Sequence, residues 1–135
     1  MGVSRETGGN TLFGRMGETV AKWARHRPKL LEAIEYTNGT HTEDDVLAMI
    51  LLGRLTLWAD DAGAFVTEFI DYPRMKVVNL FLVAGERDKM WPLEAQVVAH
   101  GKANGCKRIM GGGRRGWTRV LPEYHDGGAF MYKDI

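Results

Sequence analysis

Apolar residues recur at helical spacing in the first third of the chain. Val20, Trp23 and Ala24 keep this spacing, and the pattern continues through Leu30, Leu31 and Ile34, which predicts helical structure over 18–36. Pro28 lacks an amide N–H, so we expect a break or kink that leaves two helical pieces. Asn38-Gly39 is a typical helix stop and should end the second piece.

A second amphipathic helix is predicted directly after this stop. Thr42 is a candidate N-cap, and three acids follow it in the first turn, where the helix dipole favours negative charge. We expect this helix to end at Gly53 and to bury the apolar side formed by Val46, Leu47, Met49, Ile50 and Leu51.

The pattern then changes to that of strands. Short apolar or alternating runs at 55–59, 64–70 and 76–84 are separated by turn residues, which predicts an antiparallel three-strand meander. The third run, KVVNLFLVA, is nearly continuous in apolar residues, as expected for a central strand covered on both faces.

The remaining elements complete an α+β chain with a mixed sheet. We expect a mobile or extended arm over 1–17, because it holds five glycines and few core-forming residues, and a single domain over 18–135. The expected order after the meander is a polar loop at 85–91, a helix at 92–104, a strand at 107–111, a helix at 114–122 and a strand at 129–133.

Composition narrows the class of protein without naming a reaction. A chain of 135 residues with 44% hydrophobic residues is typical of one globular domain, and the single cysteine, Cys106, excludes an internal disulfide. We expect no secretory signal and no membrane span, because no apolar run is long enough.

Charge is distributed unevenly along the chain. Residues 43–71 hold seven acids against one arginine, whereas 102–135 hold seven basic residues against three acids. These regions could pair within one fold, which we favour, or between neighbouring copies of the chain.

Candidate chemistry is sparse. Gly111-Gly112-Gly113 lacks the Lys-Ser/Thr of a phosphate-binding P-loop, so we interpret it as a tight turn. The four histidines lie far apart in the sequence and give no metal-ligand spacing, so we expect no metal. Glu68 is a candidate general base if it faces a cleft. A protein partner, or less favourably a nucleic acid, could contact the basic segment through Arg114, Arg115, Trp117 and Arg119.

Several short phrases carry a family resemblance: THTEDDV (40–46), LTLW (55–58), VTEFIDYPR (66–74) and GRRGWTRVL (113–121). Together with the order of elements from residue 18 onward, they resemble small proteins of tailed bacteriophages that have a GCN5-related N-acetyltransferase (GNAT) fold and are often encoded near head and portal genes. The resemblance covers about residues 20–135. It implies a GNAT-like mixed sheet with helices on both faces.

The resemblance also indicates where coenzyme chemistry would lie. Acetyl-CoA enzymes of this fold carry Arg/Gln-x-x-Gly-x-Gly/Ala after the long central strand, and its amides bind the pyrophosphate. Here that stretch begins Ala84-Gly85-Glu86, with a single glycine, and Glu86 and Asp88 would repel a pyrophosphate. If acetyl-CoA binds, the resemblance places it at Val83, Ala84 and Gly85, with Glu68 or Glu86 as base. The tyrosine acid of the last helix is not at its expected place, since Tyr124 comes only after Pro122.

Three functions follow as expectations. The first is a non-enzymatic virion component of a tailed phage, in the head, head–tail or internal assembly, which needs no cofactor and contacts other virion proteins and possibly its own copies. It would reside in the virion, and in the host cytoplasm during assembly. The second is an active acetyl-CoA-dependent N-acetyltransferase. The third is an ejected or host-directed phage protein that binds nucleic acid or a host factor through 107–119.

Overall fold

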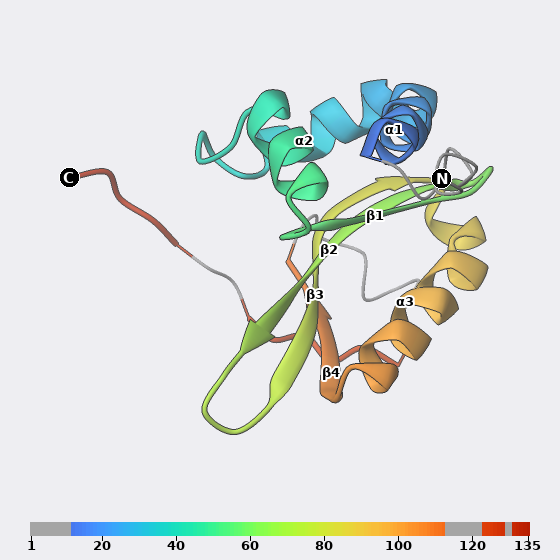
Figure 1. Cartoon of the computed structure of the whole chain (residues 1–135). Coiled ribbons are helices and arrows are strands. Elements are labelled where there is room, and N and C mark those ends of the chain that lie inside the picture. The colour runs from blue at the N-terminus through green and yellow to red at the C-terminus, as the bar shows by residue number, and fades with distance from the viewer. Residues whose placement is uncertain (1–11, 113–122, 129–130) are drawn as a thin grey trace.

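The computed structural model describes residues 12–112, 123–128 and 131–135 (Figure 1). Within them the chain forms three α-helices, one 3-10 helix and a sheet of four strands. In chain order these are α1 (Leu12–Glu35), α2 (Glu43–Leu51), β1 (Thr56–Ala59), β2 (Gly63–Asp71), β3 (Lys76–Gly85), η3 (Arg87–Lys89), α3 (Trp91–Ala103) and β4 (Cys106–Gly111).

Helix α1 contains the kink that Pro28 predicts. The backbone at His26 leaves the helical region, with φ −118° and ψ 15°, two residues before the proline. Proline removes a helical hydrogen bond and its ring clashes with the preceding turn, which accounts for the break. The helix begins at Leu12, so residues 12–17 are helical and do not belong to the arm expected over 1–17. Residues 1–11 lie outside the described part of the chain.

Helix α2 begins with the cap that the sequence predicts. The Thr42 hydroxyl accepts a hydrogen bond from the Asp45 amide at 3.2 Å, and the Asp45 carboxylate accepts one from the Thr42 amide at 2.9 Å. This reciprocal pair is a capping box, and it satisfies two amides that the helix itself cannot. The helix ends at Leu51, and Gly53 follows with φ +79°.

The predicted antiparallel meander is confirmed. The strand order is β1-β2-β3-β4, with β1–β2 and β2–β3 antiparallel and β3–β4 parallel. The register shifts between Val66 and Thr67, which pair with Leu82 and Leu80 and leave Phe81 as the extra residue of a β-bulge. Pairing of β3 with β4 runs from Lys76 to Leu80, so the carboxyl half of β3 extends beyond its β4 partner.

Strand β3 lies between two hydrophobic cores, as its apolar sequence predicts. Leu82 and Ala84 join the core beneath α1 and α2, while Val78 and Leu80 join the core beneath α3. Figure 1 shows the helices divided in this way, with α1 and α2 on one side of the sheet and α3 on the other. The fold is therefore α+β with a mixed sheet covered on both faces.

The carboxyl end differs from the sequence expectation. Met131–Lys133, part of the strand expected at 129–133, are not in a strand, and Figure 1 shows the last residues running away from the rest of the domain. Residues 129 and 130 and the helix expected at 114–122 lie outside the described part. The basic partner site expected at Arg114, Arg115, Trp117 and Arg119 lies outside it too.

Candidate functional site

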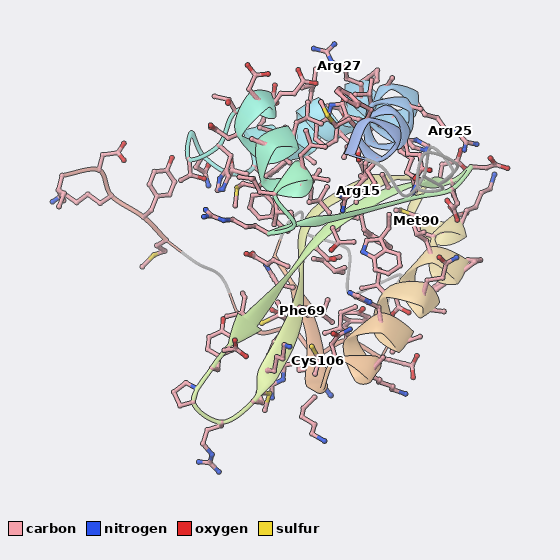
Figure 2. All side chains as sticks on the ribbon, in the orientation of Figure 1. Arg15, Arg25, Arg27, Phe69, Met90 and Cys106 are labelled. Carbon is pink, nitrogen blue, oxygen red and sulfur yellow. The ribbon has the colours of Figure 1, made fainter. Side chains whose placement is uncertain are left out.

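The turn between β3 and α3, residues 84–91, is where the family resemblance would place coenzyme binding. Strand β3 ends at Gly85, one turn of 3-10 helix follows, and α3 begins at Trp91 with Pro92 in its first turn. Met90 is only 3% exposed and packs into the core beneath α3. Figure 2 shows it between the end of the sheet and the start of α3. The turn is thus fixed to the core by a buried side chain.

Gly85, the glycine expected to approach a ligand, instead approaches backbone of the β1–β2 turn. Its φ is +138°, and a Cβ added there would lie 2.4 Å from the Ala62 carbonyl oxygen. Its register partner Gly63 is equally crowded, since a Cβ there would lie 2.2 Å from the Ala84 oxygen. Two glycines are therefore required by the close contact of two turns, without any ligand.

Four backbone amides in this region donate hydrogen bonds within the fold. The Glu86 amide donates to the Ala62 carbonyl at 3.0 Å, and the Lys89 amide donates to the Glu86 carbonyl at 3.0 Å. On the facing turn, the Asp60 carboxylate accepts from the amides of Ala62 and Gly63 at 2.9 and 3.2 Å. An anion site needs N–H groups that point outward without partners, and these four do not.

The single lysine of the turn is engaged by a carboxylate of the same turn. Lys89 Nζ lies 2.9 Å from a Glu86 carboxylate oxygen. The hydrogen bond to Glu86, and then the charges of Glu86 and Asp88, raise the pKa of Lys89. A lysine held by a carboxylate offers less attraction to a diphosphate, and the exposed Asp88 adds repulsion.

The two candidate bases are not brought together. Glu68 lies on β2, half-buried, and its carboxylate accepts a hydrogen bond from Asn79 Nδ2 at 2.9 Å across the strand pair. Glu86 follows Asn79 by seven residues along the chain, which at ~3.3 Å per residue separates it from Glu68 by roughly 20 Å. The other two expected coenzyme residues, Val83 and Ala84, have side chains in the hydrophobic cores.

Tyr124 makes a contact that the sequence does not reveal. Its hydroxyl donates to a Glu94 carboxylate oxygen on α3 at 3.0 Å. Burial, and then the negative charge of Glu94, raise the pKa of Tyr124 well above its ordinary value. The tyrosine therefore stays protonated and joins 123–128 to α3.

The acidic segment pairs with α1. Arg27 contacts Glu43 through Nε and Nη2 at 2.7 and 2.9 Å, Trp23 Nε1 donates to the same carboxylate at 2.7 Å, and Arg25 forms an ion pair with Asp61. The hydrogen bonds from Arg27 and Trp23 lower the pKa of Glu43. Among the described residues, no ion pair joins 43–71 to 102–135, the pairing that the charge pattern suggested.

No cluster of three or more metal-ligating side chains occurs within 12–112, 123–128 and 131–135. In the same part of the chain, no helix combines the length and apolar character needed to cross a membrane.

Comparison of the chain with protein-family models, with curated proteins and with solved structures found no match.

Proposed function

We propose that this chain is a non-enzymatic virion component of a tailed bacteriophage, built on a GNAT-like fold without a working coenzyme site. The phage assignment rests on the sequence phrases at 40–46, 55–58, 66–74 and 113–121. The order of two helices, an antiparallel meander, a helix and a parallel fourth strand supports the GNAT-like assignment, because the resemblance predicts this order.

The proposal depends mainly on the contacts that the β3–α3 turn makes with the β1–β2 turn. A coenzyme diphosphate would need outward-facing amides beside Gly85. Gly85 instead packs against the Ala62 carbonyl, and the amide of Glu86 donates to that same carbonyl. Opening the turn for a ligand would break this hydrogen bond and the packing of Gly63 against Gly85, which disfavours the acetyltransferase alternative.

A scaffolding role also fits the two expected acids. Glu68 is engaged by Asn79 and Glu86 by Lys89, so each carboxylate has a structural partner within the fold. The two carboxylates do not lie together around one reacting atom, as acid–base catalysis by the pair would require.

Mass spectrometry of gradient-purified particles tests the virion role. The proposal predicts that peptides of this chain copurify with the capsid at a fixed ratio after nuclease and high-salt washing. Absence from washed particles, with abundant chain in the infected-cell lysate, would contradict it and favour a host-directed role.

Deleting residues 1–11 tests the expected N-terminal arm without removing any residue of α1. If the arm anchors the chain, the deletion variant folds, with an unchanged melting temperature, but is lost from particles. Unchanged incorporation would show that the contact lies elsewhere on the domain.

A further inference from the structure

One end of the domain carries basic side chains from three segments that are separate in the sequence. These are the β2–β3 turn, the last turn of α3 and the start of β4, which Figure 1 shows at the end of the sheet away from α1 and α2. Lys76 pairs with Cys106 in the parallel register, and a Cβ on Gly101 of α3 would lie 3.5 Å from the Cys106 Cβ. We call this group the basic end: Arg74, Lys76, Lys102, Lys107 and Arg108.

The fold holds these side chains at the surface. Pro73-Arg74 forms the tip of a tight turn, which two hydrogen bonds between the backbones of Tyr72 and Met75 close at 2.9 and 3.3 Å. Four of the five basic residues are exposed. Lys76 is partly buried, and its ammonium lies 4.5 Å from the centroid of the Phe69 ring. This cation–π contact positions the lysine without neutralising its charge.

Acidic residues do not neutralise the basic end. Asp71 is the only acid in the stretches 71–76 and 101–108, which hold all five basic residues. It lies opposite Lys76 in the sheet register but forms no ion pair with it. In the part of the chain that the structure describes, no acid forms an ion pair with any member of the group. Two arginines of α1, by contrast, are paired with carboxylates of the acidic segment.

The surroundings of the charges favour one kind of polyanion. Binding to an anionic membrane needs apolar side chains that insert beside the charges, and single-stranded nucleic acid stacks its bases on free aromatic rings. Phe69 and Tyr72 are exposed here, at 38% and 46%, but the Phe69 ring already contacts the Lys76 ammonium and stacks with the His100 ring. A duplex needs neither feature, because its phosphates face outward with one charge per about 1.7 Å of its axis.

We propose that the basic end binds the phosphate backbone of double-stranded nucleic acid without reading its sequence. Long basic side chains on a turn and at strand and helix ends suit phosphate contacts, and among them α3 contributes only its last turn, so no helix is presented to a groove. This binding goes beyond the virion role and does not rest on it. It also differs from the contact expected over 107–119, because the fold assembles it from three segments and it uses no residue of 113–122.

Fluorescence anisotropy of the full chain with a short DNA duplex, and with an RNA duplex of the same sequence, tests the proposal. Binding of either duplex supports it, and the tighter one identifies the natural source of the phosphates. With about four phosphates contacted, Kd should rise roughly 100-fold between about 50 and 200 mM salt. No binding at the lower salt concentration, or binding that salt does not weaken, would overturn the proposal.

Lys107→Gln combined with Arg108→Gln tests the site. The double variant should weaken duplex binding about 10-fold and reduce the salt slope by about two. Lys22→Gln combined with Lys29→Gln is the matched control, because it removes the same charge from exposed positions on α1. The control should bind as the wild type does. Equal losses in the two double variants would mean that only net charge matters and would overturn the proposal.

A protective role of the same side chains gives a different result. Strand β4 is the last in the described sheet order, and lysine and arginine on an edge strand prevent aggregation. Double-variant protein that aggregates, but whose monomeric fraction binds duplex as the wild type does, would assign Lys107 and Arg108 to that role and overturn the proposal. Arg74→Gln lies in a turn rather than on the edge, and it should weaken binding about 3-fold with an unchanged melting temperature.

Two further comparisons separate this site from its alternatives. Arg114→Gln combined with Arg115→Gln changes the segment that the sequence favours. A loss of duplex binding confined to that variant would overturn the assignment to the basic end. Tighter binding to phosphatidylserine vesicles or to polyglutamate than to duplex, at equal concentration of negative charge, would overturn the choice of nucleic acid.

Discussion

Glycine has opposite surroundings in the β3–α3 turn and in the first half of α1. At Gly85 a Cβ would lie 2.4 Å from a carbonyl oxygen, whereas at Gly17 it would meet nothing within 4 Å. The turn is filled by backbone contacts, internal hydrogen bonds and an ion pair, while α1 leaves apolar side chains exposed. The turn where the family resemblance would place a coenzyme is thus filled by contacts of the fold itself, whereas Phe13 and Val20 of α1 remain exposed to solvent.

Gly85→Ala should have the largest effect on stability. It combines a strained positive φ with a backbone clash, so we expect a loss of about 4 kcal/mol in the free energy of unfolding. Gly39→Ala is the matched control, because Gly39 has φ +86° but open space beside it, and strain alone should cost about 1 kcal/mol. Urea denaturation measures both. Equal losses would mean that the contact with Ala62 contributes nothing.

Met90→Ala and Met16→Ala compare one residue type in the two regions. Met90 is buried at 3% exposure, so its truncation leaves a cavity and should cost about 3 kcal/mol. Met16 on α1 is 37% exposed, and its truncation should change the free energy of unfolding by less than about 0.5 kcal/mol. Thermal unfolding of both variants measures these losses. Similar losses for the two variants would contradict the comparison.

Glu43, the first residue of α2, contacts Trp23 and Arg27 of α1 and gives a pH prediction. Its pKa is lowered from an ordinary value of 4.5 by Arg27 and Trp23. The ionised carboxylate therefore stabilises the fold at neutral pH, and this contribution is lost as the pH falls below about 4.5 and through the folded pKa.

Glu43→Gln should remove that part of the pH dependence and cost about 1 kcal/mol at pH 7. Denaturant midpoints at a series of pH values, with Glu35→Gln as an exposed control on α1, measure it. A variant with the same acid sensitivity as the wild type would assign the pH dependence to other carboxylates.

Local signals in the sequence predicted much of the fold. Thr42 and Asp45 gave the helix cap, Pro28 the kink, and KVVNLFLVA the central strand, because each depends on residues close together in the chain. The start of α1 was missed because Gly14 and Gly17 suggested an arm, although Phe13, Met16 and Val20 keep helical spacing. That spacing was readable, but the exposure of these side chains depends on which side of α1 packs into the core, and Trp23 is on that side.

The candidate site was less predictable, because its character depends on residues distant in the sequence. Gly85 reads as a ligand-binding glycine until Gly63 and Ala62 are placed against it. Tyr124 likewise gave no sign of its bond to Glu94. The acids at 86 and 88 did indicate a poor diphosphate site, but only the packing of the two turns shows that the Glu86 amide donates to the Ala62 carbonyl.

Titration of the full chain with acetyl-CoA, followed by calorimetry and by the amide NMR signals of residues 84–89, tests the central claim most directly. The closed turn predicts no saturable heat and no shift at Gly85 or Glu86 up to millimolar coenzyme. Stoichiometric micromolar binding that shifts these two amides would contradict the account and favour a working acetyltransferase.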